Sequence, residues 1–293
     1  MLPQEIKDII FLNLDFETLE KTRELQSNYV NKTTEYKCIN EAALNGNLEN
    51  MKWLKKNGCL FDTKTFSQAA RNGNLDNMKW LKEKECNWSR WTFIYAAENG
   101  NLENMKWLKE NKCPWAEYTF AYAAENGNLD NMKWLKEQGC GWDFLTFPKA
   151  AENGNLDNMK WLKEQGCPWG RHESLHVFSK AAENGNLENM KWLKENGCPW
   201  DYVTFEYAAL NGNLDNMKWL KEQGCPWSIW TFEFAAWNGN LENMKWLKQE
   251  GCPWVARHMY KILGNKRNLE WLEENGCPRQ QPNFLFSILG QNT

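Results

Sequence analysis

Apolar and polar positions along the chain repeat with a fixed period instead of varying freely. The phrase Asn-Gly-Asn-Leu recurs at intervals of 27 residues, with one interval of 31, and begins at Asn45, Asn72, Asn99, Asn126, Asn153, Asn184, Asn211 and Asn238. A ninth, degenerate copy runs over 264–272. Self-similarity at a fixed period is typical of stacked repeats, each of which covers the apolar face of its neighbour.

One unit, residues 92–115, predicts two short helices. Residues 92–98 contain paired alanines and no helix breaker, and Gly100 suits the left-handed residue that ends a helix. Asn101 is a good N-cap for a second helix, and the helix dipole stabilises the negative charge of Glu103 in its first turn. Apolar residues at i, i+3 and i+6 give this helix one buried face: Leu102, Met105 and Leu108. The proline that follows Cys in most copies is expected to stop it.

The whole pattern therefore predicts an all-α solenoid of about nine helix-turn-helix units. The phrase Thr-Phe-x-x-Ala-Ala-x-Asn-Gly-Asn-Leu-x-Asn-Met-Lys-Trp-Leu-Lys-x-x-Gly-Cys resembles the ankyrin repeat. The unit is about six residues shorter than the usual repeat, so its hairpin loop is trimmed to Cys-Pro-Trp and three further residues. Phe replaces the usual Pro, and Asn replaces the usual His. This form is similar to the ankyrin arrays of giant DNA viruses and some algae, and we assign it residues 36–281.

Residues 1–35 differ from the repeats. The run that begins Leu2-Pro3 and continues with spaced apolar residues resembles the start of an F-box. That resemblance implies contacts to the linker subunit of a cullin-type ubiquitin ligase through Leu2, Pro3, Ile6, Ile10 and Leu14. The segment is shorter than a complete F-box, and a plain cap over the first repeat explains it equally well. At the other end, residues 282–293 align with one more first helix and are expected to cap the array.

Positions that change between units predict the partner-binding surface. They are the residues after Cys-Pro-Trp, the two between Thr-Phe and Ala-Ala, and the one after Ala-Ala. Aromatic residues and arginine, which dominate protein interfaces, recur there: Arg90, Trp91, Tyr95, Tyr118, Tyr122, Phe144, Tyr202, Tyr207, Trp230, Phe234 and Trp237. The alternative is that some of these residues pack between adjacent first helices.

Two tryptophan series recur instead in fixed registers, which favours packing. We expect the second-helix series to pack against the next unit: Trp53, Trp80, Trp107, Trp134, Trp161, Trp192, Trp219, Trp246 and Trp271. The other series follows the helix end and is expected to cover the loop edge: Trp88, Trp115, Trp142, Trp169, Trp200, Trp227 and Trp254.

Composition narrows the function classes. The formal net charge of -3, from 35 basic and 38 acidic residues, gives no basic surface for nucleic acid. No apolar run is long enough for a membrane helix, and the charged N-terminus is unlike a signal peptide, so we expect a cytoplasmic protein, in the host cytoplasm if the source is viral. The ten cysteines would then be reduced and serve packing.

One sequence resembles a catalytic motif. His172-Glu173-Ser174-Leu175-His176 matches His-Glu-x-x-His, in which two histidines one helical turn apart bind zinc. It lies in the four-residue insertion of the 31-residue unit, without an identifiable third ligand or substrate cleft. We therefore expect no enzyme and no cofactor, and keep His172 and His176 only as a weak metal-binding candidate. The expected partner is a protein.

Overall fold

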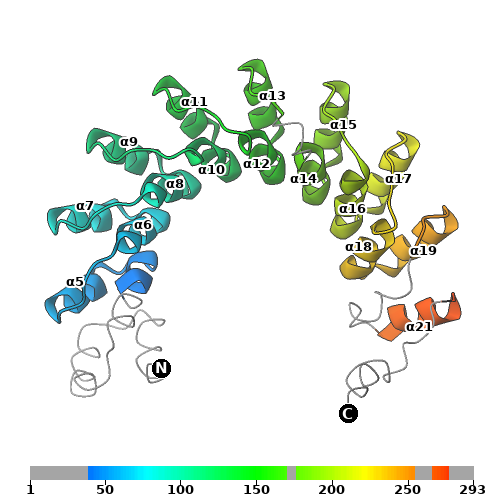
Figure 1. Cartoon of the computed structure of the whole chain (residues 1–293), viewed down its shortest axis with the longest axis horizontal. Coiled ribbons are helices and arrows are strands. Elements are labelled where there is room, and N and C mark those ends of the chain that lie inside the picture. The colour runs from blue at the N-terminus through cyan, green and yellow to red at the C-terminus, as the bar shows by residue number, and fades with distance from the viewer. Residues whose placement is uncertain (1–38, 170–175, 255–265, 277–293) are drawn as a thin grey trace, which may run out of the picture. The chain divides into compact units, whose positions relative to one another are not determined.

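The computed structural model describes residues 39–169, 176–254 and 266–276, and consists there of helices without strands (Figure 1). The first helix of each pair is 39–44, α6 (Thr63–Asn72), α8 (Arg90–Asn99), α10 (Thr119–Asn126), α12 (Thr146–Asn153), α14 (His176–Asn184), α16 (Tyr202–Asn211) or α18 (Thr231–Asn238). The second helix is α5 (Leu48–Lys56), α7 (Leu75–Glu83), α9 (Leu102–Glu110), α11 (Leu129–Glu137), α13 (Leu156–Glu164), α15 (Leu187–Glu195), α17 (Leu214–Glu222), α19 (Leu241–Gln249) or α21 (Lys266–Glu274). The predicted solenoid of helix-turn-helix units is confirmed.

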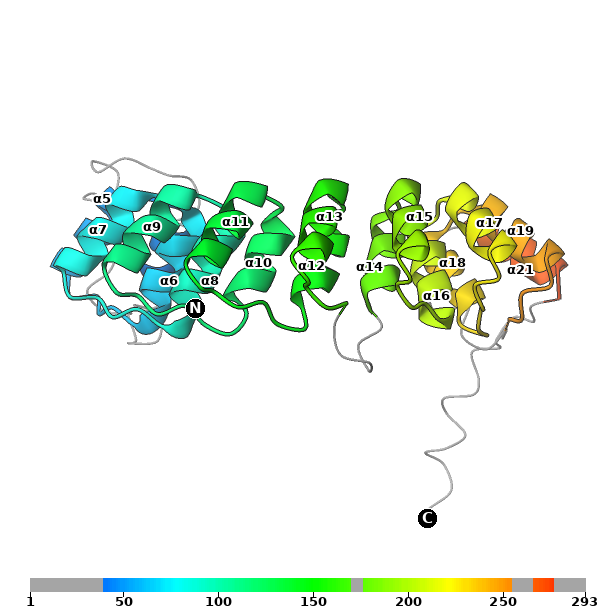
Figure 2. The same ribbon diagram turned by 90° about the horizontal axis from the view of Figure 1, so that it is seen from above.

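The chain divides into two compact units, Met1–Thr146 and Phe147–Thr293, each considered by itself. Within each unit the first helices form one layer and the second helices the other (Figure 1). Within each unit, consecutive helix pairs lie side by side in the view from above (Figure 2). The core of a pair is its fixed residues, as in Phe93, Ala96, Ala97, Met105 and Leu108, all fully buried.

The predicted start of the second helix is confirmed. The Asn101 side chain caps α9 by accepting hydrogen bonds from the backbone N–H groups of Glu103 and Asn104. These bonds satisfy donors that have no partner inside the helix. The same cap recurs at Asn74, Asn128, Asn155, Asn186 and Asn213.

The glycine between the two helices is required for two reasons. Gly185 ends α14 at φ 85°, a conformation that costs an L-residue free energy. In addition, a Cβ at Gly185 would lie 2.6 Å from Nδ2 of Asn211, in the next repeat. Asn211 crosses over this glycine to donate a 3.0 Å hydrogen bond to the Glu183 carbonyl. The equivalent asparagines Asn99, Asn126, Asn184 and Asn238 likewise tie their repeats to the preceding ones.

A third asparagine provides a buried tie between repeats. Nδ2 of Asn104, on α9, donates a 2.6 Å hydrogen bond to the carbonyl of Gly73 in the preceding repeat. We call this bond the asparagine staple. It recurs as Asn131 to Gly100, Asn189 to Gly154, Asn216 to Gly185, Asn243 to Gly212 and Asn268 to Gly239. The staple satisfies a carbonyl at a helix end that has no partner inside its own helix.

The second helix ends in a backbone turn. The proline that was predicted to stop it lies beyond this turn. The helix α9 finishes at Glu110, and Cys113 N–H donates back to the Leu108 carbonyl at 2.9 Å. The turn needs a left-handed residue before the cysteine. Most copies place glycine there, whereas Glu85 and Lys112 adopt φ values of 57° and 62°.

Both tryptophan series serve packing. Trp115 packs edge-on against the buried Phe93 of its own pair at 5.9 Å, and the Lys109 ammonium lies 3.4 Å from its ring centroid. The expected cover over the loop edge is therefore confirmed. The second-helix series differs from expectation in its partner. Trp219 contacts Trp200, in the loop that precedes its own pair, at 6.1 Å.

The cysteines that follow the second helices are packing residues, as expected. All eight that the structure describes are buried: Cys59, Cys86, Cys113, Cys140, Cys167, Cys198, Cys225 and Cys252. Burial raises the pKa of the Cys113 thiol to about 12. Such thiols are poor nucleophiles because they remain protonated near neutral pH.

Candidate protein-binding surface

Three of the positions that vary between repeats fall on one face of each first helix. They lie two residues before, two after and five after the buried phenylalanine, a spacing of i, i+4 and i+7 that one helical face presents. We call this face the stripe, and the residues of one helix a row. In the first unit the rows are Lys64, Gln68 and Arg71 on α6; Trp91, Tyr95 and Glu98 on α8; and Tyr118, Tyr122 and Glu125 on α10.

In the second unit the described row residues are Lys149 and Glu152 on α12; Lys180 and Glu183 on α14; Val203, Tyr207 and Leu210 on α16; and Trp230, Phe234 and Trp237 at α18. All of them are half-buried or exposed, whereas the intervening Phe and Ala-Ala positions are buried. The stripe is therefore the part of the first-helix layer that a partner can reach.

The rows of α6 and α8 form a cation–aromatic cluster. Trp91 stacks on Tyr95 with ring centroids 5.9 Å apart, and the Arg71 guanidinium lies 5.1 Å from the Tyr95 ring centroid. Arg71 also pairs with Glu98 at 2.8 Å. Arg90 lies 5.6 Å from the Trp91 ring, which remains 37% exposed. The cluster holds its side chains in place while leaving the indole accessible.

The row of α10 begins with a second aromatic contact. Tyr118 packs edge-on against Phe144 at 6.2 Å, where Phe144 lies in the loop before α12. Tyr118, Tyr122 and Phe144 are each half-buried. These rings are partly used within the fold, which agrees with the alternative that some predicted contact residues pack against neighbouring repeats.

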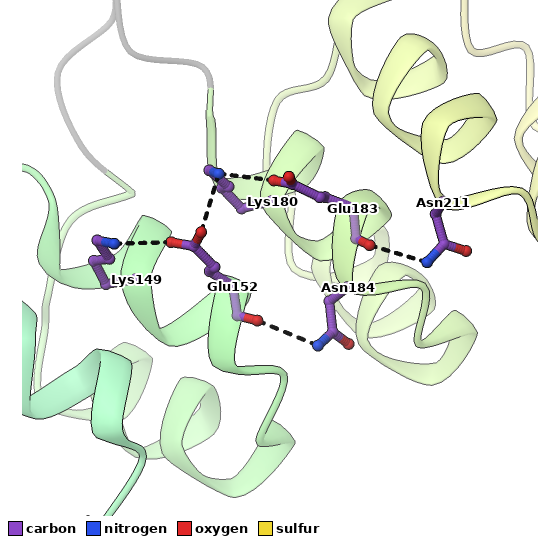
Figure 3. A network of polar contacts seen from close by, with 6 residues as sticks. All are labelled: Lys149, Glu152, Lys180, Glu183, Asn184 and Asn211. Carbon is purple, nitrogen blue, oxygen red and sulfur yellow. Dashed lines mark hydrogen bonds and ion pairs between the residues drawn. The ribbon is translucent and has the colours of Figure 1, made fainter. Parts of the chain in front are cut away.

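Charged residues occupy the rows of α12 and α14 (Figure 3). Glu152 pairs with Lys149 at 3.1 Å and with Lys180 at 3.2 Å, and Lys180 pairs with Glu183 at 2.7 Å. Burial disfavours ionisation of Glu152, but the two lysines outweigh it and lower its pKa. Burial likewise disfavours the charge on Lys180, yet Glu183 and Glu152 raise its pKa overall. Both lysines are therefore already neutralised by neighbours.

The rows of α16 and α18 contain no charged residue. Tyr207 contacts Phe234 at 6.0 Å, and Phe234 contacts Trp237 at 4.7 Å. Trp230 lies one turn before Phe234, whose N–H donates to the Trp230 carbonyl. Trp230 and Trp237 are 43% and 49% exposed. We call these six residues, Val203, Tyr207, Leu210, Trp230, Phe234 and Trp237, the apolar patch.

Just inside the stripe lies a buried carboxyl group. Glu206, on α16, accepts a 2.5 Å hydrogen bond from the Ser228 hydroxyl. Burial raises the pKa of Glu206, and the bond from Ser228 offsets part of that effect. Because its position faces the next first helix and is only 7% exposed, Glu206 contributes to packing between repeats.

The eleven predicted contact residues fall into two sets. Eight lie on the stripe itself, while Arg90, Phe144 and Tyr202 lie one residue before a row. The prediction selected only aromatic residues and an arginine after the loop. It therefore omitted the charged residues of the stripe: Lys64, Arg71, Glu98, Glu125, Lys149, Glu152, Lys180 and Glu183. Their register relative to the buried phenylalanine is the signal that would have found them.

The metal candidate receives no support from the described residues. His176 is the first residue of α14, its side chain is not described, and His172 lies outside the described residues. Across 39–169, 176–254 and 266–276 no three His, Cys, Asp or Glu residues are grouped as metal ligands would be. Over the same ranges no helix combines the length and apolar character that crossing a membrane requires. The segments 1–35 and 282–293 also lie outside the described residues.

Comparison with known proteins supports the repeat assignment. Residues 39–118 and 66–146 match the model of a family described as ankyrin repeats in three copies, and that match indicates a protein–protein interaction scaffold. The ankyrin resemblance is thus confirmed over 39–146, and the later helix pairs repeat the same phrase and the same asparagine staple. No curated protein matches the chain.

Solved structures add only a distant likeness. Two crystal structures of the pentatricopeptide repeat protein PPR10 in complex with an 18-nt psaJ RNA element match at 14% identity, with TM-scores of 0.35 and 0.34. In both, the match covers 95% of this chain and 54% of that protein, so the chain spans about half its length. A likeness this weak carries no argument about ligands.

Proposed function

We propose that the chain is a protein-binding scaffold whose stripe contacts the partner. The observation that carries this proposal is the division within each repeat between a fixed framework and three variable positions on one face. Asparagine staples, capping residues and core residues recur from pair to pair, while the stripe changes from charged to aromatic. Repeat arrays use extended surfaces of this kind for recognition.

The composition of the stripe supports a protein partner. Large rigid aromatics such as Trp91, Trp230 and Trp237 bury much area on binding while losing few rotamers. They are also the aromatic stripe residues that stay most exposed. We assign no reaction, no cofactor and no nucleic-acid ligand to this surface.

A capture experiment tests the proposal. The variant Trp91→Ala/Trp230→Ala/Trp237→Ala removes three exposed rings and leaves the framework intact. The control Lys106→Ala/Lys191→Ala changes exposed residues on second helices. Quantitative mass spectrometry of proteins retained from a cytoplasmic extract should show partners lost from the stripe variant and kept by the control. Identical retention by both variants would overturn the proposal.

A finer function concerns the N-terminal segment. The F-box-like residues, beginning with Leu2 and Pro3, support a substrate-recruiting adaptor of a cullin-type ubiquitin ligase, acting in the cytoplasm. The alternative is a structural scaffold whose first 35 residues are only a cap. A pull-down that finds the cullin linker subunit with the full chain, and not with Leu2→Ala/Pro3→Ala, supports the adaptor. Binding of stripe partners without that linker supports the plain scaffold.

A further inference from the structure

In two rows of the stripe, a cation from the preceding row lies over the middle aromatic ring. The Tyr95 ring on α8 carries the Arg71 guanidinium at 5.1 Å, and Arg71 belongs to the row of the preceding first helix. The Tyr207 ring on α16 carries the Lys180 ammonium at 5.6 Å, again from the preceding row. In both cases a cation from one row lies over the middle ring of the next.

The row at α18 has the ring but lacks the cation. The preceding row, on α16, has Tyr207 and Leu210 at the positions that Lys180 and Arg71 occupy in the rows of α14 and α6. In the described part of the chain, no Lys or Arg lies over Phe234 or Trp237. Phe234 is joined instead by Trp237 at 4.7 Å, and Trp237 keeps 49% of its surface exposed.

We propose that the apolar patch binds an arginine or lysine side chain of the partner protein, which takes the place that Arg71 and Lys180 occupy in the other rows. This inference rests on the proposed protein-binding function and names the chemistry of the partner. The partner segment would place its cation over Phe234 and Trp237, and an adjoining apolar residue against Val203 and Leu210.

The electrostatics favour this occupant over others. The face of an aromatic ring carries negative potential, so it attracts a cation and repels a carboxylate, and tryptophan is the strongest of the three ring types. The chain is acidic overall, with a formal net charge of -3, which also favours a basic segment. The nearest row lysine, Lys180, is already paired with Glu152 and Glu183 and does not compete for these rings.

The structure offers an internal substitution that fills the site. Leu210 bears the same relation to Phe234 that Arg71 bears to Tyr95: each is the last row residue of the preceding first helix. Leu210→Arg should therefore place a guanidinium over Phe234 from within the chain and exclude the partner's cation. Leu210→Gln adds a neutral polar side chain at the same position and serves as the matched control.

The experiment selects a random dodecapeptide library against the full chain and sequences the retained peptides. Peptides whose retention depends on Trp237 should be enriched in Arg or Lys. For the tightest such peptide, Leu210→Arg should weaken binding at least about tenfold, and replacement of its arginine by neutral citrulline, or of its lysine by acetyl-lysine, at least about fivefold. Leu210→Gln loses the apolar contact but adds no charge, so it should weaken binding clearly less than Leu210→Arg does. Thermal melting checks that each variant is folded.

The outcomes separate the two proposals. Peptides that depend on Trp237 but lack basic residues, or that tolerate the neutral analogue, overturn the cation site and leave the scaffold standing. Peptides that depend on Trp91 alone do the same. If no peptide depends on Trp91, Trp230 or Trp237, the proposed stripe function fails as well. The neutral-analogue measurement uses the unmodified chain, so it remains decisive even if Leu210→Arg does not fold.

Discussion

Asn104 and the carbonyl of Gly73 are joined by a part-buried 2.6 Å hydrogen bond that links one repeat to the one before it. Asn104 is fully buried on the inner face of α9, at a position that an amphipathic pattern would assign to an apolar residue. Where it forms, the bond lets a second helix fix the end of the preceding first helix, whereas the equivalent side-chain amide of Asn77 on α7 has no hydrogen-bond partner among the described residues. The interface between repeats therefore depends on hydrogen bonding as well as on apolar packing.

Removing the staple should destabilise the array. Asn104→Ala deletes the donor and leaves the half-buried Gly73 carbonyl without this partner, at an expected cost of about 1–3 kcal/mol. Asn104→Asp keeps the shape but cannot donate from the same position, so it should cost at least as much. Urea unfolding followed by circular dichroism measures the difference, with Lys106→Ala as the surface control. An unchanged midpoint for both variants would show that the bond contributes nothing.

Replacing a non-glycine residue in a left-handed turn by glycine should stabilise the chain. Lys112 adopts φ 62° where most repeats carry glycine. Because this conformation costs a non-glycine residue about 1–2 kcal/mol, Lys112→Gly should stabilise the chain by about 1 kcal/mol.

The reverse change provides the matched control. Gly139 has φ 79° and open space where a Cβ would lie, so Gly139→Lys should lose a similar amount without any steric clash. Chemical denaturation of both variants would test the pair. Opposite signs are expected, and shifts of the same sign would refute this explanation.

The buried cysteines should report opening of the array. Burial raises the pKa of Cys86, Cys198 and Cys252 to about 12, and that of Cys140 to about 11. At pH 8 these thiols stay protonated and enclosed, so an alkylating reagent should modify them only when repeats open. Mass spectrometry after a timed pulse gives the extent of labelling at each site. Rapid modification of any of them in the native protein would contradict the packing described here.

The ion pairs of α12 and α14 predict a pH dependence. The pKa of Glu152 is lowered on folding, so its contribution to stability is present above its unfolded pKa of about 4.3 and is lost as the pH falls through the folded value. Glu152→Gln should therefore be less stable than the wild type at pH 7 and equal to it near pH 3. Because Glu152 is partly exposed, the difference at pH 7 should shrink in high salt.

Glu206 should give a pH dependence of stability opposite to that of Glu152. Burial raises its pKa, so its contribution to stability is greatest when it is protonated and is lost as the pH rises through the folded pKa. Glu206→Gln keeps an acceptor for Ser228 and removes the buried charge. We expect this variant to match or exceed the wild type in stability at pH 7, and the difference to close near pH 4. If Glu206→Gln loses more stability at pH 7 than at pH 4, Glu206 does not have a raised pKa in the folded protein.

Local chemistry was the part of the fold that the sequence predicted well. Gly100 and Asn101 indicate the end of one helix and the start of the next because both effects act within a few residues. The staple of Asn104 could not be located in the same way, since its acceptor lies 31 positions earlier in the chain. Its signal was an asparagine repeated at a core register, which a hydrophobic pattern alone does not explain.

The candidate surface was predicted in outline and missed in detail. Tyr95 and Tyr207 were found because aromatic residues vary between repeats. Their partners Arg71 and Lys180 were not, because each comes from a neighbouring repeat and is charged. Stacking of neighbouring repeats brings each ring next to its cation, and only the geometry shows that both rings are already covered.

The glycine carbonyl that receives each staple has a consequence for how such a chain can change. The staple recognises backbone of the preceding repeat and no variable side chain, so every repeat is a compatible neighbour for every other. Loss or gain of one 27-residue segment by recombination leaves the staple asparagine and its acceptor glycine in register at the new junction, and alters only the order in which the rows follow one another. New surfaces can therefore arise by shuffling whole repeats, without disturbing the bonds that hold neighbouring repeats together.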